Sequence, residues 1–216
     1  NPMINNYVIS NVKKYKNKYK GYRSIVFFHW NYELELYPQP YHRKLSHDLA
    51  GLGIDLVIGA HPHRISGFEI INNTPILYSI GNFIFPDDFF FNGKLNFPSF
   101  CKLQLAFELD VNGNHKCHFF KYKKSENIIK YLYSEDLSNS PTLNEYSKFS
   151  SLSHKLYNKW FKENRIQKKI LPIYYSHESE ISLSIKNVLN YLRTLIIKII
   201  VKYFSFKLKT CLKKFF

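Results

Sequence analysis

Hydrophobic and polar positions along the first sixty residues predict a helix followed by a strand–helix–strand unit. Apolar residues recur at roughly helical spacing over residues 3–20, and Gly21 follows as a stop signal. The run SIVFFHW, residues 24–30, is β-branched and aromatic, which predicts a buried strand. Residues 37–54 predict a helix with prolines in its first turn, and DLVIG, residues 55–59, predicts a second buried strand. This order predicts a parallel pair of strands with a right-handed connection.

An antiparallel part is predicted next. Residues 66–85 predict a hairpin that turns at Asn72-Asn73, a pair that tolerates left-handed backbone. A second hairpin is indicated by the alternation of residues 100–111, the turn pair Asn112-Gly113 and the returning residues 115–122. We therefore expect an α/β (α+β) fold in which a parallel part precedes an antiparallel part.

The pattern changes near residue 134. Residues 134–144 are loop-like, residues 142–163 favour a helix, and a last long helix is predicted over about residues 182–210. The apolar positions of the last helix share one face: Ile185, Val188, Leu189, Leu192, Leu195, Ile196 and Ile199. We divide the chain into a main domain, residues 1–133, a linker and helix, residues 134–180, and an amphipathic basic helix, residues 181–216.

Composition indicates a globular, strongly basic protein. Apolar residues make up 45% of the 216 residues, and the formal net charge is +15. A basic surface attracts nucleic acid, anionic lipid or acidic polymers without choosing among them. No nucleic-acid-binding module accompanies the scattered lysines, so we expect no specific nucleic-acid partner. The three cysteines have no spacing that indicates a disulfide framework or a zinc site.

Three histidines are expected at the carboxyl ends of the two parallel strands. His29 ends the first strand, and His61 and His63 follow the second. Active sites of such folds lie at this edge of the sheet, and neutral imidazole is a common ligand for zinc, iron and manganese. Pro62 is expected to hold His61 in extended backbone, so that His61 and His63 point the same way. A strand-end histidine is more often a packing residue than a ligand, and spacing alone leaves both interpretations open.

Two further stretches could contribute polar groups to the same edge. Glu33 and Glu35 follow His29, and such a carboxylate could be a ligand, a partner of a histidine, a proton shuttle or an exposed loop acid. Gly81 and Asn82 follow another predicted strand. Gly81 would allow close backbone approach and Asn82 could donate to an anionic oxygen, although Gly-Asn also forms ordinary turns.

Residues 27–85 resemble the C-terminal half of the capsule-synthesis CapA family, also called poly-γ-glutamate synthesis, within the calcineurin-like metallophosphoesterases. The matching motifs are the HW block with Glu33, the run DLVIGAHPH, and PILYSIGNF. The resemblance implies a two-layer β sandwich flanked by helices, with a metal centre at the strand ends. It implies that His29, His61 and His63 are ligands of divalent metal ions (Mn, Zn or Fe). It also places His29, Glu33 and Asn82 among the catalytic residues.

The chain departs from the family pattern in two ways. The Asp-containing strand end and the Gly-Asp and Gly-Asn-His turns of the family's first half do not precede residue 24, and Asn31 replaces the glycine of the usual HWG. A two-metal centre also needs carboxylates and a bridging ligand. We therefore expect a truncated half with an incomplete metal site, which alone does not catalyse.

These features are compatible with two alternative functions. In the first, the complete protein is a metal-dependent hydrolase that acts on an anionic polymer or on a phosphoester or amide substrate in capsule metabolism. In the second, it is a non-catalytic, membrane-associated component of polymer synthesis or export. Residues 182–216 motivate the second, because this basic amphipathic stretch could lie on an anionic membrane, although it could also be a packing helix with a basic outer face. The expected location is the bacterial cytoplasm or a membrane surface.

Overall fold

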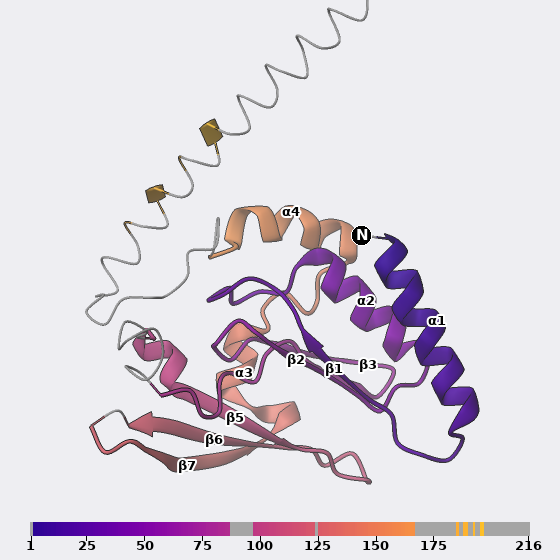
Figure 1. Cartoon of the computed structure of the whole chain (residues 1–216), viewed down its shortest axis with the longest axis horizontal. Coiled ribbons are helices and arrows are strands. Elements are labelled where there is room, and N and C mark those ends of the chain that lie inside the picture. The colour runs from indigo at the N-terminus through magenta and orange to yellow at the C-terminus, as the bar shows by residue number, and fades with distance from the viewer. Residues whose placement is uncertain are drawn as a thin grey trace, which may run out of the picture.

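The fold consists of helices on one face of a mixed sheet and a second, antiparallel sheet on the other face, as Figure 1 shows. The computed structural model describes residues 2–86, 97–123 and 125–166, together with residues 185, 188, 189, 192, 195 and 196. The predicted α/β class is confirmed. The three layers are stacked in the order helices, mixed sheet, antiparallel sheet.

The mixed sheet has the strand order β1-β2-β4-β3. Its strands are β1 (Ile25–His29), β2 (Leu56–Ala60), β3 (Phe68–Ile71) and β4 (Thr74–Leu77). β1, β2 and β4 are parallel, and β3 is antiparallel to β4. The strand–helix–strand unit predicted from the sequence is therefore confirmed. So is the hairpin turn, because Asn72 and Asn73 have φ of 49° and 63°, in the left-handed region that asparagine tolerates.

β1 is an edge strand, and the prediction that it is buried is wrong in part. Ile25 and Phe27 are 56% and 60% exposed, whereas Val26 and Phe28 pack on the helical side of the sheet. β2, by contrast, is central and mostly buried. A short apolar run does not reveal whether a strand has neighbours on both sides, which explains the error.

The helical layer contains α1 (Pro2–Lys18), α2 (Pro40–Ala50) and α4 (His154–Asn164). The continuous helix predicted over residues 142–163 is wrong, because a short α3 (Pro141–Tyr146) is separated from α4 by an irregular stretch. Each of the two helices has its own serine cap. The Ser140 hydroxyl accepts from the backbone N–H of Leu143 at 3.2 Å, and Ser153 is the N-cap of α4. Two start signals in this segment thus produce two helices.

The second sheet is antiparallel, in the order β5-β6-β7. Its strands are β5 (Leu103–Glu108), β6 (Lys116–Lys123) and β7 (Ile128–Asp136), and short 3-10 turns lie at Ser99–Lys102 and Leu137–Asn139. The predicted β5–β6 hairpin is confirmed, but β7 was not predicted, and residues 134–136 were assigned to a loop. Most β7 side chains are exposed, so the strand lacks the alternation that would reveal it.

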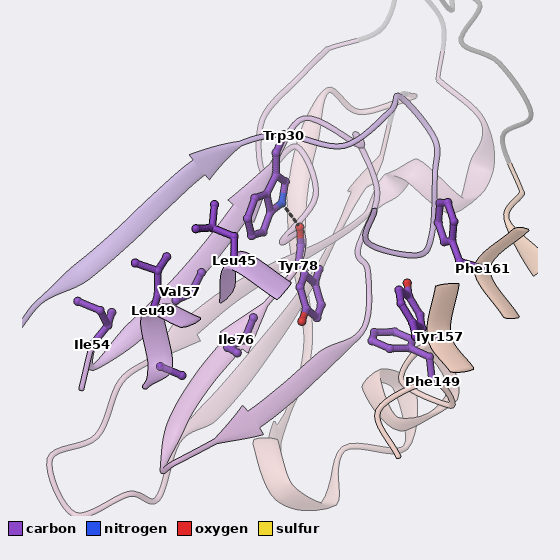
Figure 2. Close-up of a cluster of buried hydrophobic side chains, with 11 residues drawn as sticks. Trp30, Leu45, Leu49, Ile54, Val57, Ile76, Tyr78, Phe149, Tyr157 and Phe161 are labelled. Atoms are coloured by element: carbon purple, nitrogen blue, oxygen red, sulfur yellow. Dashed lines mark hydrogen bonds between the residues drawn. The ribbon is translucent and has the colours of Figure 1, made fainter. Parts of the chain in front are cut away.

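Two hydrophobic clusters hold the layers together. Figure 2 shows the first, between the mixed sheet and the helices, where the Trp30 indole N–H donates to the backbone oxygen of Tyr78 at 2.9 Å. The second lies between the two sheets and includes Leu56, Leu105 and Phe119. Residues 137–161 contribute to both clusters, and the hydroxyl of Tyr157 donates to the backbone oxygen of Pro38 at 2.6 Å.

A buried ion pair joins the helical layer to the sheet. The guanidinium of Arg43 on α2 donates to both carboxylate oxygens of Glu69 on β3, at distances from 2.6 to 3.1 Å. Each of the two side chains is 2% exposed. The hydroxyl of Tyr78 donates to the same carboxylate at 2.5 Å, and the ring nitrogen of His47 lies 3.1 Å away. Arg43 also donates to the backbone oxygens of Leu152 and Ser150, which links the segment before α4 to α2.

The predicted last helix lies almost entirely outside the described residues. The six positions that are described are helical, and each of their side chains is exposed. Within the described ranges, no helix combines the length and apolarity that crossing a bilayer requires.

Candidate functional site

Three imidazoles lie close together at one edge of the mixed sheet. His29 is the last residue of β1 and is in register with Ala60, the last residue of β2, so His61 follows directly beside it. The ring centroids of His29 and His61 are 4.6 Å apart, and those of His61 and His63 are 5.9 Å apart. The parallel strands thus bring together histidines that are separated by about thirty residues of sequence.

The backbone of the histidine turn differs from the extended conformation that we expected. His61 has a φ of 98° and His63 a φ of 59°, so the prediction of extended backbone at His61 is wrong. A hydrogen bond from the loop after β1 fixes this turn, because the backbone N–H of Leu34 donates to the backbone oxygen of Pro62 at 2.9 Å. Left-handed backbone at residues with a side chain costs about 1–3 kcal/mol each, and such residues cluster at functional sites.

His63 is oriented by Asn82. The Nδ1 atom of His63 lies 2.6 Å from the side-chain oxygen of Asn82, which can only accept, so Nδ1 carries the proton. The other ring nitrogen, Nε2, is therefore left with a free lone pair, as in metal-binding histidines whose second nitrogen donates to an oxygen. Phe97 and Phe85 pack against the ring, with centroid distances of 4.9 and 5.6 Å.

Gln104 fixes the loop that carries Asn82. Its side-chain oxygen accepts from the backbone N–H groups of Asn82 and Phe83 at 2.5 and 2.6 Å. Gly81 has a φ of 85°, and an added Cβ would lie 2.7 Å from the same oxygen, so glycine is required at this close approach. The sequence analysis did not identify Gln104. The only sign of its role in the sequence is that a polar residue interrupts the apolar residues of β5.

The two glutamates have different environments. Glu33 is half-buried, its Oε2 atom is buried without a hydrogen-bond partner, and burial raises the pKa of its carboxyl. Leu34, the next residue, bonds to Pro62, so Glu33 belongs to the loop beside the histidine turn. Glu35 is fully buried and accepts from the backbone N–H groups of Tyr37 and Ile166, which indicates a structural role.

Asn31 can take the place of the family glycine without distorting the loop. Its φ is 73°, a left-handed value that asparagine adopts more readily than other residues with a side chain. The side-chain amide donates to the oxygen of Tyr37 at 3.0 Å, and its oxygen accepts from Gln39 at 3.1 Å. Asparagine in place of the family glycine is therefore compatible with the backbone of this loop.

The donor chemistry at this edge fits a divalent transition-metal ion. Burial, more than the nearby histidines, lowers the pKa values of His61 and His63 below the ordinary value. Both rings are therefore neutral at pH 7, as ligands must be. Glu33 offers an unpartnered carboxylate oxygen. In the described part of the chain, no three His, Cys, Asp or Glu side chains are grouped so that they could hold one metal ion, so these imidazoles do not form a complete coordination sphere.

Comparison with known proteins identifies this segment. Residues 4–87 match the family model of the bacterial capsule synthesis protein PGA_cap. Over 61 residues the chain is 38% identical to the PGA biosynthesis protein CapA of Bacillus subtilis strain 168, and over 80 residues it is 31% identical to the capsule biosynthesis protein CapA of Bacillus anthracis. Residues 4–87 are a segment of the CapA family.

The CapA-family segment contains every residue of the histidine edge, including Glu33 and Asn82. The aligned stretches cover 28% and 36% of this chain, but only 16% and 20% of the two Bacillus proteins. An uncharacterized protein of Sinorhizobium fredii is 40% identical over 50 residues, which are 23% of this chain and 11% of that protein. The family assignment thus supports a link to capsule or poly-γ-glutamate biosynthesis and applies to a part of the chain.

Proposed function

We propose that the histidine edge supplies the imidazole ligands of a divalent metal centre in a CapA-like hydrolase that acts on phosphoester or amide bonds of a capsular polymer. The observation that carries this proposal is the meeting of His29, His61 and His63 at the ends of two parallel strands. A metal ion bound there would activate water and stabilise negative charge on the reacting group.

Each residue of the site would have a separate task. His29, His61 and His63 would hold the ion, and Asn82 would keep the Nε2 atom of His63 unprotonated. Glu33 has a raised pKa, so it could accept or release a proton nearer to neutral pH than an exposed glutamate. The metal set is completed by groups beyond these imidazoles, because metal-assisted attack on phosphorus also needs carboxylate or bridging ligands.

Metal content of the 216-residue chain tests the proposal. Wild-type protein, the variant His61→Ala/His63→Ala and the control variant His115→Ala/His118→Ala would be loaded with Mn²⁺ or Zn²⁺, desalted and analysed for bound metal. We expect the first variant to lose most of its bound metal and the control to keep it. The control histidines belong to the other sheet, since His118 lies in β6 and His115 directly precedes that strand. Equal metal in both variants would refute the assignment.

A second assay separates binding from catalysis. The metal-loaded chain would be incubated with bis(4-nitrophenyl) phosphate, and release of nitrophenol would be followed. Turnover that is lost in His61→Ala/His63→Ala supports the hydrolase. Metal binding without turnover would show that the imidazoles bind the ion and that catalysis needs the groups that complete the metal set.

A membrane-associated role is the second candidate, and one observation favours it. The described positions of the last segment are helical and 44–59% exposed, and all six are apolar: Ile185, Val188, Leu189, Leu192, Leu195 and Ile196. Their spacing places them on one helical face, and lysines and arginine intervene in the sequence. Such a face would enter the interface of an anionic membrane while the basic residues contact lipid headgroups.

Flotation with phosphatidylglycerol vesicles tests this role. Leu189→Asp/Ile196→Asp in the full chain should abolish co-flotation, because two charges would be placed on the apolar face. The control Tyr7→Asp/Leu156→Asp replaces exposed apolar side chains of α1 and α4 and should float like wild type. Equal flotation of both variants would remove the argument for the last helix.

A further inference from the structure

The free edge of β1 presents unpaired backbone groups. In the described part of the chain the only neighbour of β1 is β2. The N–H of Trp30 donates to Ala60 at 3.1 Å, and the oxygen of Ser24 accepts from Leu56 at 3.4 Å. Because the bonding direction alternates along a parallel strand, the N–H and C=O groups of Ile25, Phe27 and His29 point to the free edge.

Among the residues that the structure describes, this edge has none of the features that usually prevent strand addition. Proteins protect edge strands with charged side chains, prolines, bulges or covering segments. The sequence of β1, IVFFH, contains no Asp, Glu, Lys, Arg or Pro, and its five residues pair with β2 without a register shift. Ile25 and Phe27 are more than half exposed and share one side of the strand. An edge of this kind is suited to bind a further strand.

A groove beside β1 provides a place for the side chains of such a strand. It has a volume of about 760 Å³ and lies between the C-terminal end of α1 and residues 22–27. Tyr15, Tyr19 and Tyr22 line it as a continuous aromatic wall, with ring centroids 6.3 Å apart at each step. All three tyrosines are exposed, so the wall is open to a ligand.

The charge around the groove is basic. Residues 1–32 contain no aspartate or glutamate, whereas residues 13–23 contain five lysines and one arginine. Lys16, Lys20 and Arg23 line the groove, and Lys20 and Arg23 are exposed. A second copy of this chain would bring the same basic surface to the interface, and like charges in apposition disfavour it. An acidic ligand is favoured instead.

We infer that the free edge of β1 is a docking site for an extended acidic polypeptide segment, which adds to the mixed sheet as a further strand. Backbone hydrogen bonds to Ile25, Phe27 and His29 would supply affinity, and alternate side chains would contact the tyrosine wall and the cations Lys20 and Arg23. A nucleic acid would meet the same charge, but it cannot continue the backbone hydrogen bonding of a sheet. This inference does not depend on a bound metal.

The test uses the full chain and a fluorescein-labelled peptide in which glutamate and valine alternate. Binding would be measured by fluorescence anisotropy, and amide hydrogen exchange of residues 24–30 would be measured with and without peptide. We expect saturable binding and slower exchange in that segment. Lys20→Glu/Arg23→Glu should weaken binding about tenfold or more. The control Lys155→Glu/Lys159→Glu makes the same change in net charge on α4 and should bind like wild type.

A backbone variant separates strand addition from simple charge attraction. Phe27→Pro removes one outward N–H, and proline is tolerated on an edge strand at such a position. Its circular dichroism should match wild type and its peptide affinity should fall; should this variant not fold, the exchange measurement on wild type carries the same test. The inference is overturned by unchanged exchange at residues 24–30, by equal binding of a lysine–valine peptide, by displacement of the peptide by a single-stranded oligonucleotide, or by self-association alone.

Discussion

The buried ion pair between Arg43 and Glu69 allows a quantitative test of how the helical layer is attached to the sheet. The perturbation is Glu69→Leu, which removes the carboxylate that accepts from Arg43, Tyr78 and His47. Arg43 is 2% exposed and would be left as a buried cation that keeps only two backbone acceptors. Breaking such a pair by removing one partner costs about 3–5 kcal/mol. The unpaired hydroxyl of Tyr78 adds about 1 kcal/mol.

The companion variants complete a double-mutant cycle. Arg43→Met should cost a similar amount, because it leaves Glu69 charged and buried, and the backbone oxygens of Leu152 and Ser150 without their donor. The double variant Arg43→Met/Glu69→Leu contains no uncompensated charge. We therefore expect its cost to be smaller than the sum of the single costs by at least about 2 kcal/mol.

Urea unfolding followed by tryptophan fluorescence measures all four proteins, because Trp30 lies in the same core as Tyr78. Unchanged unfolding slopes would show that the variants differ in the native state and not in the extent of unfolding. Costs that add within about 0.5 kcal/mol would refute the reasoning, because independent sites show such additivity. The buried pair would then be a geometric coincidence without energetic coupling.

Two further predictions concern the core beside the site. In Gly59→Ala, the added methyl group would overlap the backbone oxygen of Tyr78 and the indole nitrogen of Trp30, so we expect a loss of about 3 kcal/mol in urea unfolding and a changed tryptophan spectrum. Burial lowers the pKa of His42 from 6.5 to about 3, so the unfolded chain takes up a proton first as the pH falls, and stability is lost from about pH 6.5 downward. Between pH 7 and pH 5 the wild type should lose about 2 kcal/mol more than His42→Phe, and parallel unfolding curves of the two would contradict this.

The parts of the fold that are fixed by local patterns were predictable. The buried apolar run of β2, the helix α2 with Pro40 at its start, and the hairpin turn at Asn72-Asn73 each depend on neighbouring residues alone. The strand β7 was not predictable, because both of its faces are largely exposed and no alternation results. The exposure of Ile25 and Phe27 was not predictable either, since it depends on which other strands lie beside β1.

The candidate site likewise has a part that the sequence predicts and a part that it does not. The spacing of His29, His61 and His63 placed all three at one edge of the sheet, because parallel strands end together. The role of Gln104 could not be found in the sequence, because its contact with Asn82 joins segments that are more than twenty residues apart. Long-range polar contacts of this kind depend on the assembled fold and carry no local signal.

Backbone strain is concentrated in the loops around His29, His61 and His63. In the described residues, eight residues other than glycine have positive φ, and five of them lie in the loops around the edge: Asn31, Leu34, His61, His63 and Phe83. Asn72 and Asn73 are explained by a hairpin, but a core does not require left-handed histidines. Asn31 adopts such a φ readily, but at about 1–3 kcal/mol each the four other residues have a combined cost that is comparable to the stability of a small domain. Glycine would relieve this strain, so the packing of the fold alone does not account for histidines at these two positions.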